Sequence, residues 1–116
     1  PDPPAQVQTL RITVLSTMVA DYGMQGEWGF SALVEADGRK LLVDTGAAPD
    51  TVLRNAKALG IDLSDVEDVV LTHNHDDHTA GLLSLRAAFQ AKNPLAMSRV
   101  HAAPDIFLSR PENGSE

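Results

Sequence analysis

Three of the four histidines in this 116-residue chain fall inside one six-residue window, from His73 to His78 (HNHDDH). Protonated imidazoles this close repel one another, and neutral ones compete for too few hydrogen-bond partners. A divalent cation removes both problems, because neutral imidazole and carboxylate are its preferred nitrogen and oxygen ligands. The alternative is a loop of surface polar residues. The clustering favours a metal site, so the fold has to bring these side chains together.

Composition narrows the class of protein around this window. The length allows one small domain. The net charge of -7 argues against nucleic acid and against an anionic membrane surface as partners, and leaves a small-molecule substrate. Without cysteine, the chain has no disulfide, thiolate ligand or cysteine nucleophile. No apolar stretch approaches the roughly 18 residues of a membrane-spanning helix.

The two ends of the chain differ in character from its middle. The start, Pro1 to Pro4, is Pro-rich and lacks Met, which predicts either a removed signal peptide, with an exported or periplasmic protein, or a trimmed chain. Residues 1–9 are expected to form a flexible lead-in and residues 10–109 the folded body. Residues 110–116 have the composition of an exposed tail or a cleaved loop.

Hydrophobic periodicity predicts an α/β fold with a mixed β-sheet and helices packed on it. Asp37-Gly38 is a hairpin turn signal between two strand-like segments, so antiparallel pairing comes first. Helical spacing then alternates with short apolar runs, which indicates crossovers. Strands are expected at 10–15, 30–35, 40–43, 66–71 and 99–102, helices at 51–59, 79–91 and 104–109, and a loop at 21–29.

The window begins two residues after a predicted strand, and such strand ends are where α/β proteins place their chemistry. His73 and His75 are two residues apart, so in extended backbone they project to the same side and could bind one ion. Asp77 and His78 follow after the chain has turned and could face a second ion. Two ions about 3.5–4 Å apart can share a bridging hydroxide, which is a nucleophile at neutral pH.

Several segments resemble one known family. The window, preceded by residues 69–72 (VVLT), resembles the signature of the metallo-β-lactamase-fold hydrolases, and residues 41–46 (LLVDTG) resemble that superfamily's upstream motif. Residues 28–35 (WGFSALVE) and 55–62 (NAKALGID) are most similar to the branch that includes dihydropterin-phosphate synthase-like members. The resemblance covers roughly residues 10 to 108, and the window is its most specific part.

The resemblance implies roles for the residues of the window. His73 and His75 would bind the first metal, and Asp77 and His78 the second, with Asp77 also a candidate proton shuttle. The expected cofactor is zinc, two ions per complete site, with iron or manganese as alternatives.

The resemblance also suggests residues around the metals. Asp44 would lie behind the ligands, where it would fix the loop or a ligand imidazole; a turn-forming Asp before Gly is the equal alternative. Tyr22, Trp28 and His101 are secondary candidates for a substrate pocket. A loop aromatic covering the core and a surface histidine are the simpler interpretations.

The same resemblance implies that the chain is half of an αββα sandwich. Members of the superfamily are about twice as long, and their second half supplies further ligands, including a bridging carboxylate. Half a sandwich leaves an apolar sheet face bare. The expected partner is therefore the C-terminal half of the same protein, as a separate chain or missing from a fragment, or else a second copy.

The function expected from these features is metal-dependent hydrolysis. A metal-bound hydroxide would attack an ester, lactone, amide or phosphoester bond. One alternative is a mononuclear iron oxidoreductase similar to the thiol dioxygenases of this fold. Another is a non-catalytic metal-binding module. Two zinc ions per site would favour hydrolysis, and one iron ion would favour oxidation.

Overall fold

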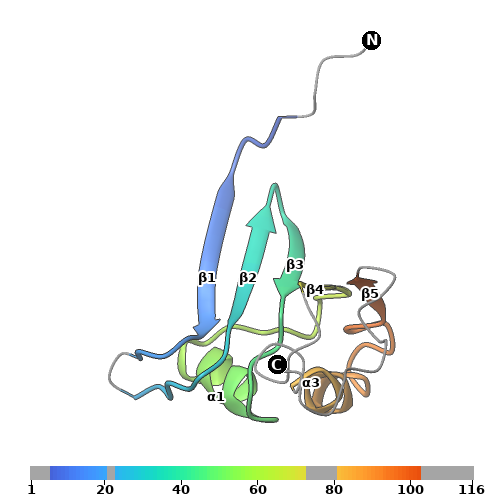
Figure 1. The fold of residues 1–116 in the computed structure, drawn as a ribbon. Helices are drawn as coiled ribbons and strands as arrows, with labels where there is room; N and C mark the ends of the chain where they lie inside the picture. The colour runs from blue at the N-terminus through green and yellow to red at the C-terminus, as the bar shows by residue number, and fades with distance from the viewer. Residues whose placement is uncertain (1–5, 21–22, 73–80, 103–116) are drawn as a thin grey trace, which may run out of the picture.

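The computed structural model of the chain describes residues 6–20, 23–72 and 81–102. These residues form a mixed sheet in the strand order β1-β2-β3-β4-β5, with helices against one face, which confirms the predicted α/β class (Figure 1). The elements are β1 (Leu10–Ser16), β2 (Ser31–Ala36), β3 (Arg39–Val43), α1 (Thr51–Ala58), β4 (Asp68–Leu71), α3 (Leu82–Phe89) and β5 (Arg99–Ala102).

The sheet changes from antiparallel to parallel at β3. Strands β1, β2 and β3 pair antiparallel, and the β2–β3 turn has positive φ at Asp37 (50°) and Gly38 (82°), as the hairpin signal predicts. Strands β3, β4 and β5 pair in parallel, with α1 and α3 in the crossovers. The carboxyl ends of these three strands therefore meet at one edge of the sheet, and the window follows directly after β4.

The core lies on the face of the sheet that the helices cover. Leu33, Leu42 and Val69 occupy one line across β2, β3 and β4, and all three are fully buried. They pack in one cluster with Val52 of α1 and Leu85 of α3. Period-two alternation in the strands and helical spacing in α1 and α3 are what bring these residues to the same layer.

The opposite face of the sheet is apolar and uncovered in the described part of the chain. Ile12, Val34 and Leu41 form its central line, and Leu10 and Val14 extend it along β1. The side chains of Leu10, Ile12 and Val14 are 62%, 58% and 48% exposed. We call this surface the bare face. It is what half of a sandwich is expected to present.

Most element boundaries differ from the sequence prediction by one residue, and two differ by more. The strand expected at 66–71 begins at Asp68, because the Val66 N–H donates to the Leu63 carbonyl (3.1 Å) and keeps Val66 in a turn. The helix expected at 79–91 is observed as α3 over Leu82–Phe89. The helix predicted at 104–109 and the tail at 110–116 lie outside the described residues. Within the described ranges, no helix is long and apolar enough to cross a membrane.

Candidate metal centre

Residues 44–48 form the turn after β3, which we call the anchor turn. It contacts the segments on both sides of the predicted site. Asp44 has φ of 58° and Gly46 has φ of 79°, so the chain turns sharply as it leaves the strand. The Asp44 N–H donates to the Val70 carbonyl (2.8 Å), and the Gly46 N–H donates to the Phe30 carbonyl (3.0 Å). These bonds join the anchor turn to β4 on one side and to the start of β2 on the other.

The side chain of Asp44 holds the residue that precedes the window. Its carboxylate accepts hydrogen bonds from the Thr72 backbone N–H (2.9 Å, at Oδ1) and from the Thr72 hydroxyl (2.7 Å, at Oδ2). Asp44 itself is buried, and its carbonyl accepts a bond from the Ser31 hydroxyl (2.7 Å). Two bonds to one carboxylate fix the position of Thr72, the last described residue before the window.

The anchor turn also contacts Gly81, which lies three residues after the window. Gly81 is buried, and a Cβ atom added to it would collide with the Thr45 carbonyl oxygen. The Gly81 carbonyl in turn accepts a bond from the Leu85 N–H (2.9 Å), which starts α3. Neighbouring residues of one turn, Asp44 and Thr45, thus meet the chain on both sides of the window.

The four predicted ligands, His73, His75, Asp77 and His78, lie outside the described residues, so their roles stay predictions. Their chemistry fits zinc or a similar ion, since imidazole nitrogen and carboxylate oxygen are ordinary ligands of that metal. Elsewhere, across 6–20, 23–72 and 81–102, no group of three or more His, Asp or Glu side chains is placed to hold a metal ion.

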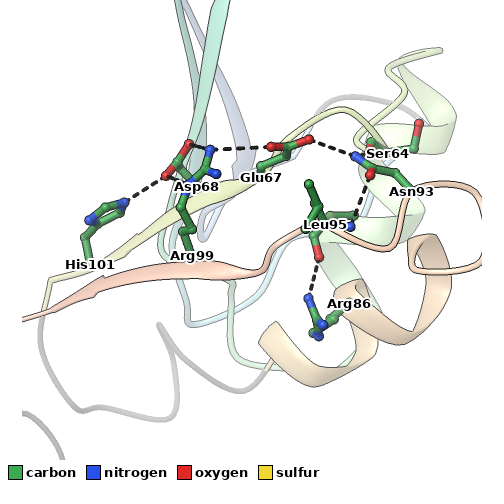
Figure 2. A network of polar contacts seen from close by, with 9 residues as sticks. Ser64, Glu67, Asp68, Arg86, Asn93, Leu95, Arg99 and His101 are labelled. Atoms are coloured by element: carbon green, nitrogen blue, oxygen red, sulfur yellow. Dashed lines mark hydrogen bonds and ion pairs between the residues drawn. The ribbon is translucent and has the colours of Figure 1, made fainter.

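The secondary pocket candidates are at the surface where they are described. Trp28 is 73% exposed, in the loop between β1 and β2. His101 lies on β5, and its Nε2 is 2.9 Å from the Asp68 carboxylate, which also accepts two bonds from the Arg99 guanidinium (2.8 and 2.9 Å; Figure 2). A surface ion-pair network therefore accounts for its described contacts. Tyr22 lies outside the described residues.

This network predicts a pH dependence of stability. Hydrogen bonds from Arg99 and then His101 hold the pKa of Asp68 well below its usual range. A depressed folded-state pKa contributes stability that is complete above the unfolded value of 3.8 and disappears as the pH falls through the lower folded value. Urea unfolding should show Asp68→Asn less stable than the wild type at pH 7. That difference should shrink steadily as the pH drops below 4; a constant difference would contradict the assignment.

Three residues of this region have no role in the sequence prediction: Glu27, Thr72 and Gly81. Thr72 and Gly81 flank the window, and their contacts with the anchor turn depend on tertiary packing. Glu27 is an acidic residue beside Trp28-Gly29 in a glycine-rich loop, and its carboxylate contacts the anchor turn (2.7 Å to the Ala47 nitrogen). The only feature of the sequence that pointed to Glu27 was its position directly before the motif of residues 28–35.

Comparison with known proteins decides the family. A sequence model of the metallo-beta-lactamase superfamily matches residues 29–113, which is most of the chain. The chain belongs to the metallo-β-lactamase superfamily. The resemblance seen in the window and in residues 41–46 is thereby confirmed. Members of the superfamily typically bind metal ions, usually zinc.

Individual relatives support the assignment to this superfamily. The 7,8-dihydropterin-6-methyl-4-(beta-D-ribofuranosyl)-aminobenzene-5'-phosphate synthase of Methanocaldococcus jannaschii is 29% identical over 108 residues, covering 88% of this chain and 35% of the relative. The ribonuclease Z of Methanopyrus kandleri is 49% identical over 53 residues, covering 46% and 18%. The crystal structure of a metal-dependent hydrolase of the beta-lactamase superfamily is 44% identical, with a TM-score of 0.55, covering 66% and 27%. The chain thus spans about a third or less of the length of these relatives.

Proposed function

We propose that this chain carries the first half of the metal site of a hydrolase. His73 and His75 would bind one zinc ion, and Asp77 and His78 a second. The observation that carries the proposal is the anchor turn, which contacts Thr72 before the window and Gly81 after it. Membership of a metal-binding superfamily supports the same reading.

The described residues position the site. Asp44 holds both the backbone and the side chain of Thr72, the residue that precedes the window. When bound, the metal ions would polarise the bond under attack and lower the pKa of a water molecule. The carboxylate of Asp77 is the group proposed to take up and return a proton.

The proposed partner is the C-terminal half of the same protein, packed on the bare face. Four ligands are too few for two zinc sites, since each catalytic zinc usually has three protein ligands. The exposed apolar side chains of β1 need a cover that the described residues do not provide. The chain covers 35% of one relative and 18% of another, so these relatives are long enough to contain such a second half. A second copy of the chain is the outcome that would replace this proposal.

The proposed substrate is a small molecule with an ester, lactone, amide or phosphoester bond. Because one relative is a ribonuclease Z, a phosphodiester is included among the reporter substrates. The net charge of -7 disfavours a long polyanion, because an acidic protein repels it outside the metal pocket.

The test measures metal content and hydrolysis together. The chain is purified together with its proposed C-terminal half and assayed for bound zinc, iron and manganese, and then with ester, phosphodiester and β-lactam reporters with and without a chelator. We expect zinc, and hydrolysis that chelation abolishes and zinc restores. The His73→Ala/His75→Ala variant should lose both metal and activity while keeping its far-UV circular dichroism. Hydrolysis that survives chelation would refute the proposal, and one iron per site would favour the oxidoreductase.

A further inference from the structure

The carboxylate of Glu27 binds the second half of the anchor turn. Its Oε2 accepts bonds from the Ala47 backbone N–H (2.7 Å) and from the Ser16 hydroxyl (2.6 Å), and its Oε1 accepts one from the Ala48 N–H (2.9 Å). The Glu27 N–H also donates to the Thr17 carbonyl (2.9 Å), which ties the residue to the end of β1. Glu27 thus connects the anchor turn to the first strand.

Gly46 makes this contact possible. A Cβ atom at position 46 would lie 2.6 Å from Oε2 of Glu27, so a larger residue would displace the carboxylate. Gly46 also has φ of 79°, which other residues rarely adopt. Burial raises the pKa of Glu27, but its interactions with the Ser16 and Thr51 side chains and with the Ala47 and Ala48 backbone outweigh this effect and lower the pKa of the carboxyl group. The group is therefore a carboxylate at neutral pH.

The anchor turn is consequently held from two directions. The side chain of Asp44 reaches outward from its first residue to Thr72, and Glu27 reaches inward to its last two residues, Ala47 and Ala48. Thr45, whose carbonyl contacts Gly81, lies between these two attachments. Releasing Glu27 would remove the bonds to Ala47 and Ala48 while the bond from Gly46 to Phe30 stays, so the turn that contacts Gly81 would lose one of its attachments.

We propose that Glu27 is a positioning residue for the metal site, acting through the anchor turn on the residues that flank the window. The inference rests on the proposed function, because it assumes a metal at His73 to His78. It predicts that Glu27 affects how the chain binds metal and not only how stable the chain is.

Asp37 offers a matched control. Its carboxylate also accepts bonds from two backbone N–H groups, those of Gln8 and Thr9, and from one hydroxyl, that of Thr9. It sits in the β2–β3 turn, at the end of these strands opposite to the anchor turn (Figure 1). Replacing either carboxylate with an amide removes the charge and keeps one accepting oxygen, but it places an NH₂ group against one backbone N–H, that of Ala48 at Oε1 of Glu27 (2.9 Å) or that of Gln8 at Oδ2 of Asp37 (3.2 Å). Glu27→Gln and Asp37→Asn therefore remove the same kind of interaction at two distances from the window.

The experiment titrates the full chain and both variants with Co²⁺ and records the visible d–d absorption, alongside urea unfolding without metal. Both variants should lose stability. Glu27→Gln should also weaken Co²⁺ binding by about tenfold and alter the absorption bands, as replacement of groups behind metal ligands does. Asp37→Asn should keep the wild-type affinity and spectrum. Ser16→Ala, which removes one donor to Glu27, should weaken binding in the same direction and serves if Glu27→Gln fails to fold.

The outcomes distinguish the positioning role of Glu27 from the proposed function. Wild-type affinity and spectrum in Glu27→Gln, or in Ser16→Ala where that variant replaces it, would overturn the positioning role and leave the proposed function standing. An equal loss in Asp37→Asn would also overturn it, since stability alone would then explain the effect. Failure of the wild-type chain to bind Co²⁺, or unchanged binding by His73→Ala/His75→Ala, would overturn the proposed function and this inference with it.

Discussion

Asp44→Ala is expected to lower the free energy of unfolding by about 3 kcal/mol and to weaken metal binding at least tenfold. The variant loses both hydrogen bonds to Thr72, one of them to a backbone N–H that no longer meets a carboxylate. Alanine also tolerates the φ of 58° poorly, at about 1 kcal/mol. Urea unfolding without metal gives the first quantity, and Co²⁺ titration of the same samples gives the second.

Asp44→Asn is the control for this prediction. Asparagine accepts positive φ more readily than alanine. Its carbonyl oxygen can accept from the Thr72 N–H, and its NH₂ group can donate to the Thr72 hydroxyl, so both contacts are kept without the charge. We expect this variant to lose less than half as much stability as Asp44→Ala. If both substitutions lowered the free energy of unfolding equally, the loss would come from the charge of Asp44 and not from its hydrogen bonds to Thr72.

Gly81→Ala is expected to destabilise the chain by about 3 kcal/mol and to disturb metal binding, although it adds only a methyl group. The new Cβ would collide with the Thr45 carbonyl oxygen, which is backbone and cannot move aside as a flexible side chain would. The anchor turn or the start of α3 has to shift instead. Thermal unfolding and Co²⁺ titration measure the two consequences.

Gly60→Ala separates this collision from the general effect of replacing glycine. Gly60 has φ of 71°, and no atom lies within 4 Å of the position that a Cβ would take. The substitution should therefore carry only the backbone strain, about 1 kcal/mol, with metal binding unchanged. A loss at Gly81 no larger than the loss at Gly60 would mean that Gly81 and Thr45 are not in close contact.

The sequence was sufficient to predict the layers of the fold because they depend on periodicity. The alternation in β1, the turn at Asp37-Gly38 and the helical spacing of residues 51–59 appear in the structure with small shifts at their ends. Val66 was misassigned because an apolar residue in a buried turn has the same pattern as one in a strand. A local sequence pattern indicates which residues are buried and at what spacing they recur. A turn that buries an apolar side chain produces the same pattern as a strand.

The contacts that support the candidate site could not be predicted from local sequence patterns. Asp44 was assigned either a turn or a place behind the ligands. The structure shows the turn and adds a bond to Thr72, 28 positions away in sequence. Glu27 reaches Ala47 and Ala48 across 20 and 21 positions. Such pairings are decided by how strands and loops stack, and no spacing rule encodes them. The four candidate ligands could be proposed from the sequence because they fall within one window.

The two contacts of the anchor turn have a consequence for the entropy of metal binding. Eight residues, 73–80, join Thr72 to Gly81, and both of these flanking residues contact the same turn. The entropy of bringing these two ends together is therefore lost when the domain folds. If the window binds metal as proposed, the ion would not have to supply that entropy, and folding energy from the core would contribute to affinity at the site.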